Sequence, residues 1–173
     1  MVMLEQLKYF VVDVDGTLTD SGIYYDDKGN ETKKFSTRDA AGFFAFMRLG
    51  INVIILTGRN SFSTKKRMKD LKVKYVFQGV KNKYDFLYNF MKKNHIKKEE
   101  IGYIGDDLND LMPMSLVGYT ACPLDSCEEI RKIANYVSKF NGGYGAFRDT
   151  VEHILKSTDK WDLVINKYCS IGI

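Results

Sequence analysis

Two aspartates stand one residue apart at the end of an apolar run early in the chain. The run, residues 9–12, leads into Asp13 and Asp15, and Gly16 and Thr17 follow. Such a pattern is typical of a buried parallel strand that ends in a loop, and ligands of open α/β sheets bind at the carboxyl ends of strands. Since alternate strand residues share a face, both carboxylates would point into one space. Crowded carboxylates repel unless a cation lies between them or one keeps its proton, so the pair predicts catalysis or metal binding.

Two further segments have the same plan, an apolar run followed by polar residues. One run precedes Thr57, Gly58 and Arg59, and another precedes the acidic segment 105–110. We expect all three strand ends to meet at one edge of the sheet. The oxygens of the acidic segment suit Mg²⁺, which takes few protein ligands and keeps several waters. The guanidinium of Arg59 suits a carboxylate or a phosphate, although a surface arginine explains this residue equally well on its own.

Strand-like and helix-like segments alternate along the chain, which is typical of a parallel sheet with helices on both faces. We therefore predict an α/β fold, a three-layer α/β/α Rossmann-like parallel sheet in a single domain over residues 1–173. Asp39 and Asn60 are the candidate caps of the first two helices. The expected strands are 9–12, 52–56, 75–77, 101–104, 117–120 and 136–137. The expected helices are 40–49, 61–71, 83–94, 108–112, 126–134, 145–155 and 161–168.

One segment, residues 22–35, breaks this alternation. It has two strand-like arms around residues 26–30, where Gly29 supplies the turn residue, so we predict a β-hairpin. It follows the aspartate pair directly, a place that suits a flap or an oligomer contact. No other insertion is long enough for a separate cap domain. We therefore expect an open site, unless a neighbouring subunit closes it, and a C-terminal helix and tail over residues 160–173.

Four segments together resemble the motifs of the haloacid dehalogenase superfamily, most of whose members are magnesium-dependent phosphatases. The segment at Asp13 resembles the first motif, that at Thr57 the second and that at Asp106 the fourth. The lysine of the third motif matches Lys83, which follows a Gln-Gly pair at the expected spacing, and Lys81 is the competing candidate. A HAD-like fold with a hairpin flap is what this resemblance implies.

The resemblance implies hydrolysis of a phosphate ester through an aspartyl-phosphate. Asp13 would be the nucleophile, and Asp15 would protonate the leaving alkoxide and then deprotonate water. Thr57 and Lys83 would hold the phosphoryl group, with help from free N–H groups at the start of a helix. The implied substrate-binding residues are Thr17, Gly58, Arg59, Arg38 and Asp39.

A Mg²⁺ cofactor is also implied. Asp13 and Asp106 would bind the ion directly, and Asp15 would bind it through its backbone carbonyl. The residues expected to support these ligands through hydrogen bonds are Asp107, Asn109 and Asp110.

Within the superfamily, the chain resembles the capless branch of tetrameric sugar-acid phosphatases. The segment with Arg38 and Asp39 resembles the substrate-side segment of this branch, and residues 142–149 match it as well. The resemblance implies a small sugar-acid phosphate as the substrate. It also implies a homotetramer in which the flap helps to close a neighbouring site, while the tail, residues 167–173, either does the same or is disordered.

Arg59 favours one substrate within this branch. In the phosphatases for the nine-carbon 2-keto-3-deoxynononate 9-phosphate, a glutamate follows the second-motif glycine, and a glutamate would repel a substrate carboxylate that Arg59 attracts. We therefore expect the eight-carbon 3-deoxy-D-manno-octulosonate 8-phosphate, a precursor of lipopolysaccharide. The nine-carbon ester stays open, as do a phosphatase of wide specificity and a noncatalytic oligomerisation module like those beside sialic-acid cytidylyltransferase domains. The complete set of candidate catalytic residues argues against the module.

Composition excludes several classes of protein. Apolar residues make up 45% of the chain, too many for a disordered protein. A net charge of +4, on lysines scattered over several segments, gives no basic stripe for nucleic acid. Short apolar runs and an N-terminus unlike a signal peptide lead us to expect no membrane partner and a cytoplasmic location. The 3 cysteines lack zinc-like spacing and are expected to be reduced thiols.

Overall fold

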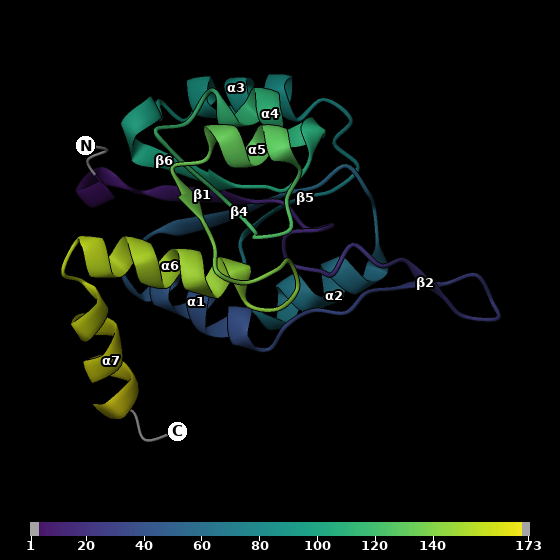
Figure 1. Cartoon of the computed structure of the whole chain (residues 1–173), viewed down its shortest axis with the longest axis horizontal. Helices are drawn as coiled ribbons and strands as arrows, with labels where there is room; N and C mark the ends of the chain where they lie inside the picture. Colours follow the sequence, from purple (N-terminus) through teal and green to yellow (C-terminus); the bar gives the residue numbers. More distant parts are fainter. Residues whose placement is uncertain (1–3, 171–173) are drawn as a thin grey trace.

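A six-stranded parallel sheet forms the centre of the molecule (Figure 1). The computed structural model describes residues 4–170, with the backbone alone for Leu4 and for 167–170. The strand order is β5-β4-β1-β6-β7-β8, and every neighbouring pair is parallel. The strands are β1 (Tyr9–Val12), β4 (Asn52–Leu56), β5 (Tyr75–Phe77), β6 (Ile101–Ile104), β7 (Tyr119–Cys122) and β8 (Tyr136–Val137).

Helices cover both faces of this sheet, so the predicted three-layer α/β/α fold is confirmed (Figure 1). On one face lie α1 (Arg38–Arg48), α2 (Phe62–Asp70) and α6 (Ala146–Ser157). On the other lie α3 (Lys83–Lys93), α4 (Leu108–Met114) and α5 (Glu128–Ile133). The remaining helical elements are the 3-10 turns η1 (Leu4–Gln6) and η2 (Lys98–Glu100) and the last helix, α7 (Trp161–Ser170). Within the described part of the chain, no helix has both the length and the apolar character needed to cross a membrane.

The central strand β1 is buried on both sides, which explains its unbroken apolar run. Phe10 and Val12 pack into the cluster formed with α1, α2 and α6, whereas Val11 packs into the opposite cluster with α3, α4 and α5. Alternate strand residues point to opposite faces, so a strand covered twice needs apolar residues at every position.

Three local expectations were wrong. β7 begins at Tyr119, two residues after the predicted start, because Val117 and Gly118 belong to the turn that leads into the strand. This turn packs closely on its surroundings, since a Cβ on Gly118 would lie 2.6 Å from the Lys98 carbonyl oxygen. The cap of α2 is Ser61, whose side chain accepts a hydrogen bond from the Thr64 N–H, rather than Asn60.

Asp39 does not cap α1 either. Thr37 holds the N-cap position without a side-chain bond, and Asp39 lies inside the helix. Its Oδ1 instead accepts a hydrogen bond of 2.9 Å from the backbone N–H of Arg148. Asp39 therefore bonds a residue 109 positions away in the sequence instead of capping the helix to which it belongs.

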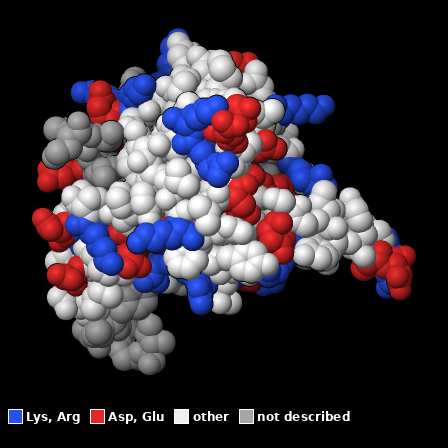
Figure 2. Space-filling view, in the orientation of Figure 1, with Lys and Arg blue, Asp and Glu red and all other residues white. Residues whose placement is uncertain are grey.

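A two-stranded antiparallel hairpin lies between β1 and α1 and projects from the body of the molecule (Figure 1). Its strands are β2 (Tyr24–Tyr25) and β3 (Glu31–Thr32). Gly29 has a φ of +77° in the connecting turn, a conformation that favours glycine. Figure 2 shows acidic side chains at the tip of this projection, and the tyrosines of β2 are exposed.

Four phenylalanines join the sheet to the α1–α6 layer. Phe147 of α6 is fully buried, and its ring centroid lies 4.6 Å from that of Phe43 and 6.2 Å from that of Phe10. Phe46 completes the cluster, with its ring centroid 5.2 Å from that of Phe10.

Replacing Phe147→Ala is expected to lower the free energy of unfolding by about 3–5 kcal/mol, because a buried aromatic ring is lost and a cavity remains. Chemical denaturation monitored by circular dichroism measures this change. Phe62→Ala is the matched control, since 79% of Phe62 is exposed, and it is expected to stay within ~0.5 kcal/mol of the parent. Equal losses in the two variants would contradict the assignment of the core.

Candidate active site

Three neighbouring strands bring the predicted segments to one edge of the sheet. Asp13 follows β1, Thr57 follows β4 and Asp106 lies two residues after β6, and these strands are adjacent in the order β4-β1-β6. The backbone N–H of Asp13 donates to the Ile104 carbonyl at 3.0 Å, which continues the sheet into the loop. The parallel sheet therefore collects residues that are far apart in the sequence.

A buried lysine joins two of the carboxylates. Lys83, at the first position of α3, places Nζ 2.7 Å from Asp13 Oδ1 and 2.7 Å from Asp110 Oδ1. All three side chains are at most 5% exposed. Burial alone lowers the pKa of Lys83, but the two carboxylates outweigh it and the net pKa is raised. Lys83 therefore stays charged, whereas the competing candidate Lys81 is exposed.

Asp110 is held by several donors at once. Its Oδ1 accepts from Lys83 and, at 2.7 Å, from the hydroxyl of Tyr103, while its Oδ2 accepts from the backbone N–H of Asp106 at 3.0 Å. These bonds leave its oxygens little capacity for a further ligand, and they fix both Lys83 and the Asp106 loop. Tyr103 was not among the predicted site residues, because a tyrosine inside a buried strand has the pattern of a core residue.

Asp13, Asp106 and Asp110 form a group that could hold a metal ion. One oxygen from each lies within 4.8 Å of the others. Burial raises the pKa of Asp13 and of Asp106, and the neighbouring carboxylates raise both further. A divalent cation would relieve this repulsion, and carboxylate oxygens are the ligands that Mg²⁺ prefers. The site fits Mg²⁺, with Asp13 and Asp106 the better ligands because Asp110 is already engaged.

The loop after β1 approaches Asp106 so closely that only glycine fits at Gly16. A Cβ there would lie 1.9 Å from Asp106 Oδ2, and the φ of +92° also favours glycine. The hydroxyl of Thr17 donates to Asp106 Oδ1 at 3.0 Å. The segment at Gly142 packs against the same loop, since a Cβ on Gly142 would lie 1.8 Å from the Gly16 carbonyl oxygen.

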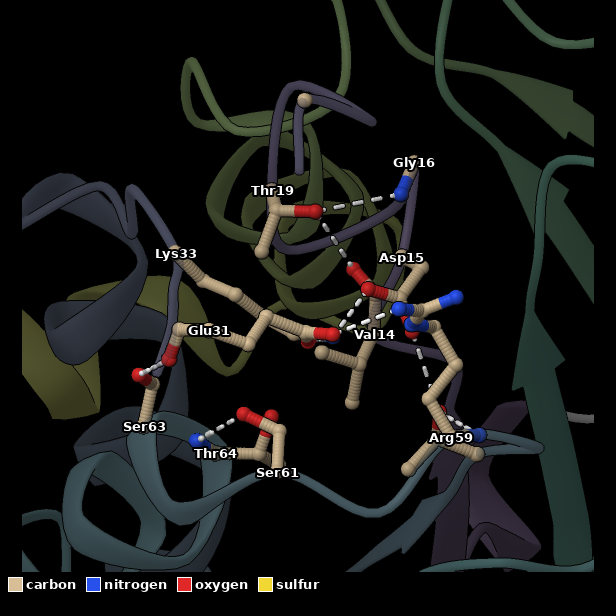
Figure 3. A network of polar contacts seen from close by, with 12 residues as sticks. Val14, Asp15, Gly16, Thr19, Glu31, Lys33, Arg59, Ser61, Ser63 and Thr64 are labelled. Atoms are coloured by element: carbon tan, nitrogen blue, oxygen red, sulfur yellow. Dashed lines mark hydrogen bonds and ion pairs between the residues drawn. The ribbon is translucent and has the colours of Figure 1, made fainter. Parts of the chain in front are cut away.

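Asp15 lies in a second polar network, drawn in Figure 3. The hydroxyl of Thr57 donates to Asp15 Oδ2 at 3.3 Å, and Lys33 of the hairpin forms an ion pair with Asp15 Oδ1. Glu31 of β3 lies 3.3 Å from Lys33 and 2.5 Å from Arg59. The sequence analysis did not single out Glu31 or Lys33. Their one signal was two charges at alternate positions of a hairpin arm, which places them on one face.

Three other predicted residues, Asp107, Asn109 and Gly58, lie in or next to the segments that follow β4 and β6. Asp107 caps α4 and accepts from the Leu108 N–H at 2.8 Å, and Asn109 is exposed on that helix. Gly58 sits in the turn after β4, where a Cβ would meet the Val80 carbonyl oxygen at 3.7 Å. These residues shape the loops after the strands.

Arg38 and Asp39 are not brought into contact with the Asp13 group. Asp39 is buried between α1 and α6, where burial raises its pKa to about 6. Arg38 lines an open groove together with Tyr144 and Arg148. Figure 2 shows acidic and basic side chains interspersed over one face of the molecule.

Comparison with known sequences agrees with this geometry. A sequence profile of the haloacid dehalogenase-like hydrolases matches residues 10–80 and 76–146. The chain belongs to this family. The matched residues include all four segments that the sequence analysis singled out.

Three similar members of the family carry the name of the same activity. A 3-deoxy-D-manno-octulosonate 8-phosphate phosphatase of Haemophilus influenzae is 34% identical over 157 residues, which cover 91% of this chain and 87% of the relative. A crystal structure of the phosphatase of this name from Moraxella catarrhalis, in complex with a magnesium ion, a phosphate ion and KDO, is 36% identical with a TM-score of 0.91 over 95% of each chain. The one from Yersinia pestis is 31% identical, with a TM-score of 0.87 over 92% of this chain and 86% of that one.

Binding of Mg²⁺ is expected to release protons at neutral pH. Ordinary carboxyls, with pKa values of about 4, would release none there, whereas the raised pKa of Asp13 and of Asp106 keeps protons on the metal-free protein. Calorimetric titration with Mg²⁺ in two buffers of different ionisation enthalpy measures the release. Asp106→Asn is expected to weaken Mg²⁺ binding strongly, and the same heat in both buffers would contradict the prediction.

The raised pKa values of Asp13 and Asp106 also determine how the stability of the protein changes with pH. A carboxyl whose pKa is raised by folding binds more protons in the folded than in the unfolded protein. Without Mg²⁺, the free energy of unfolding is therefore expected to fall as the pH rises through the raised pKa values of Asp13 and Asp106. Saturating Mg²⁺ removes this loss, because the cation binds the ionised carboxylates of the folded state. Chemical denaturation over a range of pH, with and without Mg²⁺, measures both effects.

Proposed function

We propose that this protein is a Mg²⁺-dependent phosphatase that hydrolyses 3-deoxy-D-manno-octulosonate 8-phosphate to the free sugar acid, KDO, and phosphate, a step of lipopolysaccharide synthesis. One observation carries this proposal: a buried carboxylate, Asp13, is paired with Lys83 beside Asp106 at the ends of adjacent strands. The similarity to phosphatases with this substrate supports the choice of sugar acid.

The reaction proceeds in two steps at Asp13. A carboxylate oxygen of Asp13 attacks phosphorus, the bond to the sugar oxygen breaks, and Asp15 donates its proton to that oxygen. Asp15 then takes a proton from water, whose oxygen attacks phosphorus and frees the Asp13 carboxylate. Asp13, Asp106 and the Asp15 carbonyl would hold the Mg²⁺ ion, which would supply positive charge to neutralise the phosphoryl oxygens.

The side chains around Asp13 have supporting roles. Lys83 is held in place by its ion pair with Asp110, and its positive charge lies beside the attacking carboxylate and stabilises the phosphoryl oxygens. The Thr57 hydroxyl and backbone N–H groups of the loop that follows it bind the phosphoryl group. The Arg59 guanidinium binds the carboxylate of the sugar acid, which gives the preference for the eight-carbon substrate.

The hairpin is the proposed flap of this domain. Ile23, Tyr24 and Tyr25 are 45–65% exposed on it, and such apolar exposure suits a contact between subunits. We propose a cytoplasmic homotetramer in which the flap covers a neighbouring site, and in which Arg38 and Asp39 lie on the substrate side of that assembly. The tail, residues 167–173, falls outside the residues whose side chains are described, and its part in closure stays a prediction.

Asp13→Asn is expected to lower turnover by about 10³-fold or more, because the amide is a poor nucleophile. Phosphate release in Mg²⁺ measures the loss, and circular dichroism shows whether the variant is folded. Asp70→Asn, on the exposed face of α2, removes the same charge and is expected to keep full activity. A folded Asp13→Asn variant with turnover near that of the parent would overturn the mechanism.

A substrate panel tests the identity of the sugar. We expect Mg²⁺-dependent release of phosphate, abolished by EDTA, with the highest kcat/KM for the eight-carbon ester. The panel includes the nine-carbon keto-acid phosphate, a hexose phosphate and a nucleotide. Preference for the nine-carbon ester would overturn the assignment of Arg59 and keep the chemistry, whereas no turnover of any ester would favour the assembly module.

A further inference from the structure

Four charged groups of alternating sign form a chain of ion pairs that ends at Asp15 (Figure 3). Arg59 pairs with Glu31, Glu31 with Lys33, and Lys33 with Asp15. Two of the four, Glu31 and Lys33, come from the hairpin, and the side chain of Lys33 is 1% exposed. The Ser63 hydroxyl of α2 donates to the Glu31 carbonyl at 3.0 Å, so the backbone that carries Glu31 is also held against the body.

Glu31 occupies one edge of the Arg59 guanidinium. Its Oε2 lies 2.5 Å from Arg59 Nη2, while Arg59 Nε is buried and has no acceptor among the described residues. Nε and Nη2 together form an edge that can bind a carboxylate through two parallel hydrogen bonds. A second carboxylate cannot use this edge while Glu31 holds Nη2. The hydrogen bond from Arg59 also keeps the pKa of Glu31 below its usual value, so Glu31 is ionised at neutral pH.

We propose that Glu31 lowers the affinity of the site for sugar acids by competing with the carboxylate of the substrate for Arg59. This inference rests on the proposed function, which makes Arg59 the receptor of a sugar acid. In the free protein Glu31 neutralises Arg59, and binding of the sugar acid exchanges one carboxylate for another on the same guanidinium. The displaced Glu31 stays paired with Lys33, so no carboxylate is left without a cation.

This exchange affects the binding of sugar acids and leaves the binding of other phosphate esters unchanged. A ligand with a carboxylate displaces Glu31 from Arg59 and supplies a negative charge in its place. A hexose phosphate has no carboxylate, so it gains nothing from Arg59 and leaves Glu31 in place. Specificity is the difference between the two affinities, and an internal competitor lowers the affinity of carboxylates only. Removing the charge of Glu31 should therefore tighten the binding of sugar acids and leave other esters unaffected.

The test measures Glu31→Gln, which keeps the shape of the side chain and loses its charge. The dissociation constant of free KDO, from calorimetry in Mg²⁺, is expected to fall by about fivefold, the size of one half-exposed ion pair. The KM of a hexose phosphate is expected to stay unchanged. Weaker binding of KDO would overturn the proposal, since it would mean that Glu31 orients Arg59 for the ligand, and equal changes for both compounds would overturn it as well.

Two controls separate this effect from a change in structure or overall charge. Asp27→Asn removes one negative charge from the exposed turn of the same hairpin and is expected to leave the binding of KDO unchanged. In an Arg59→Gln background, Glu31→Gln is expected to have no effect, because the contested guanidinium is gone. A fivefold tightening that persists without Arg59 would contradict the exchange.

Failure of the proposed function would give different results from failure of the exchange at Arg59. If the parent protein binds KDO but hydrolyses no eight-carbon ester, the phosphatase assignment fails, and Glu31→Gln still tests the exchange at Arg59. If the parent protein hydrolyses the ester and Glu31→Gln leaves the affinity for KDO unchanged, the phosphatase stands and the competition is excluded.

Discussion

The repulsion among buried carboxylates at the ends of β1 and β6 is the constraint on which the rest of the site depends. Asp13, Asp106 and Asp110 offer oxygens within 4.8 Å of one another, and a single buried ammonium, that of Lys83, opposes them. One cation cannot balance three ionised carboxylates at low dielectric, so the metal-free group keeps protons. A divalent cation would replace these protons and complete the balance, so the electrostatics of the buried group favour the binding of Mg²⁺.

Backbone packing holds these charges together against their repulsion. The loop after β1 touches Asp106 at Gly16, and the segment at Gly142 covers the same loop from the other side. The side chain of Asp110 closes on Gly105, where a Cβ would lie 2.4 Å from its carboxyl carbon. Because no side chain fits at these positions, the loops can approach closely enough for one metal ion to span them. The buried phenylalanines of the α1–α6 layer support this arrangement from below the sheet.

The hairpin adds a second electrostatic layer to the first. Its cation, Lys33, pairs with Asp15, and its anion, Glu31, pairs with Arg59, so this outer group carries paired charges of both signs. The inner group has an excess of negative charge that favours a metal ion. The outer group has two positive and two negative charges, so a ligand carboxylate binds Arg59 there by replacing Glu31. A balanced outer group beside an inner group that would hold a metal ion suits a substrate with a phosphate at one end and a carboxylate at the other.

Local pattern determined much of this protein, and tertiary contacts decided the rest. The strands β1, β4, β5 and β6 begin and end where the apolar runs predict, because a strand of a sheet that has helices over both faces carries apolar residues at successive positions. The meeting of Asp13, Thr57 and Asp106 follows from the same rule, since parallel strands place their carboxyl ends together. Asp39, Glu31 and Lys33 behaved differently, because their partners are distant in the sequence: Asp39 bonds a residue 109 positions away, and Glu31 pairs with one 28 positions away. The periodicity of a segment reports which face of that segment is buried, but a buried polar group takes whichever partner the packing of other segments brings to it, and only the folded chain specifies that partner.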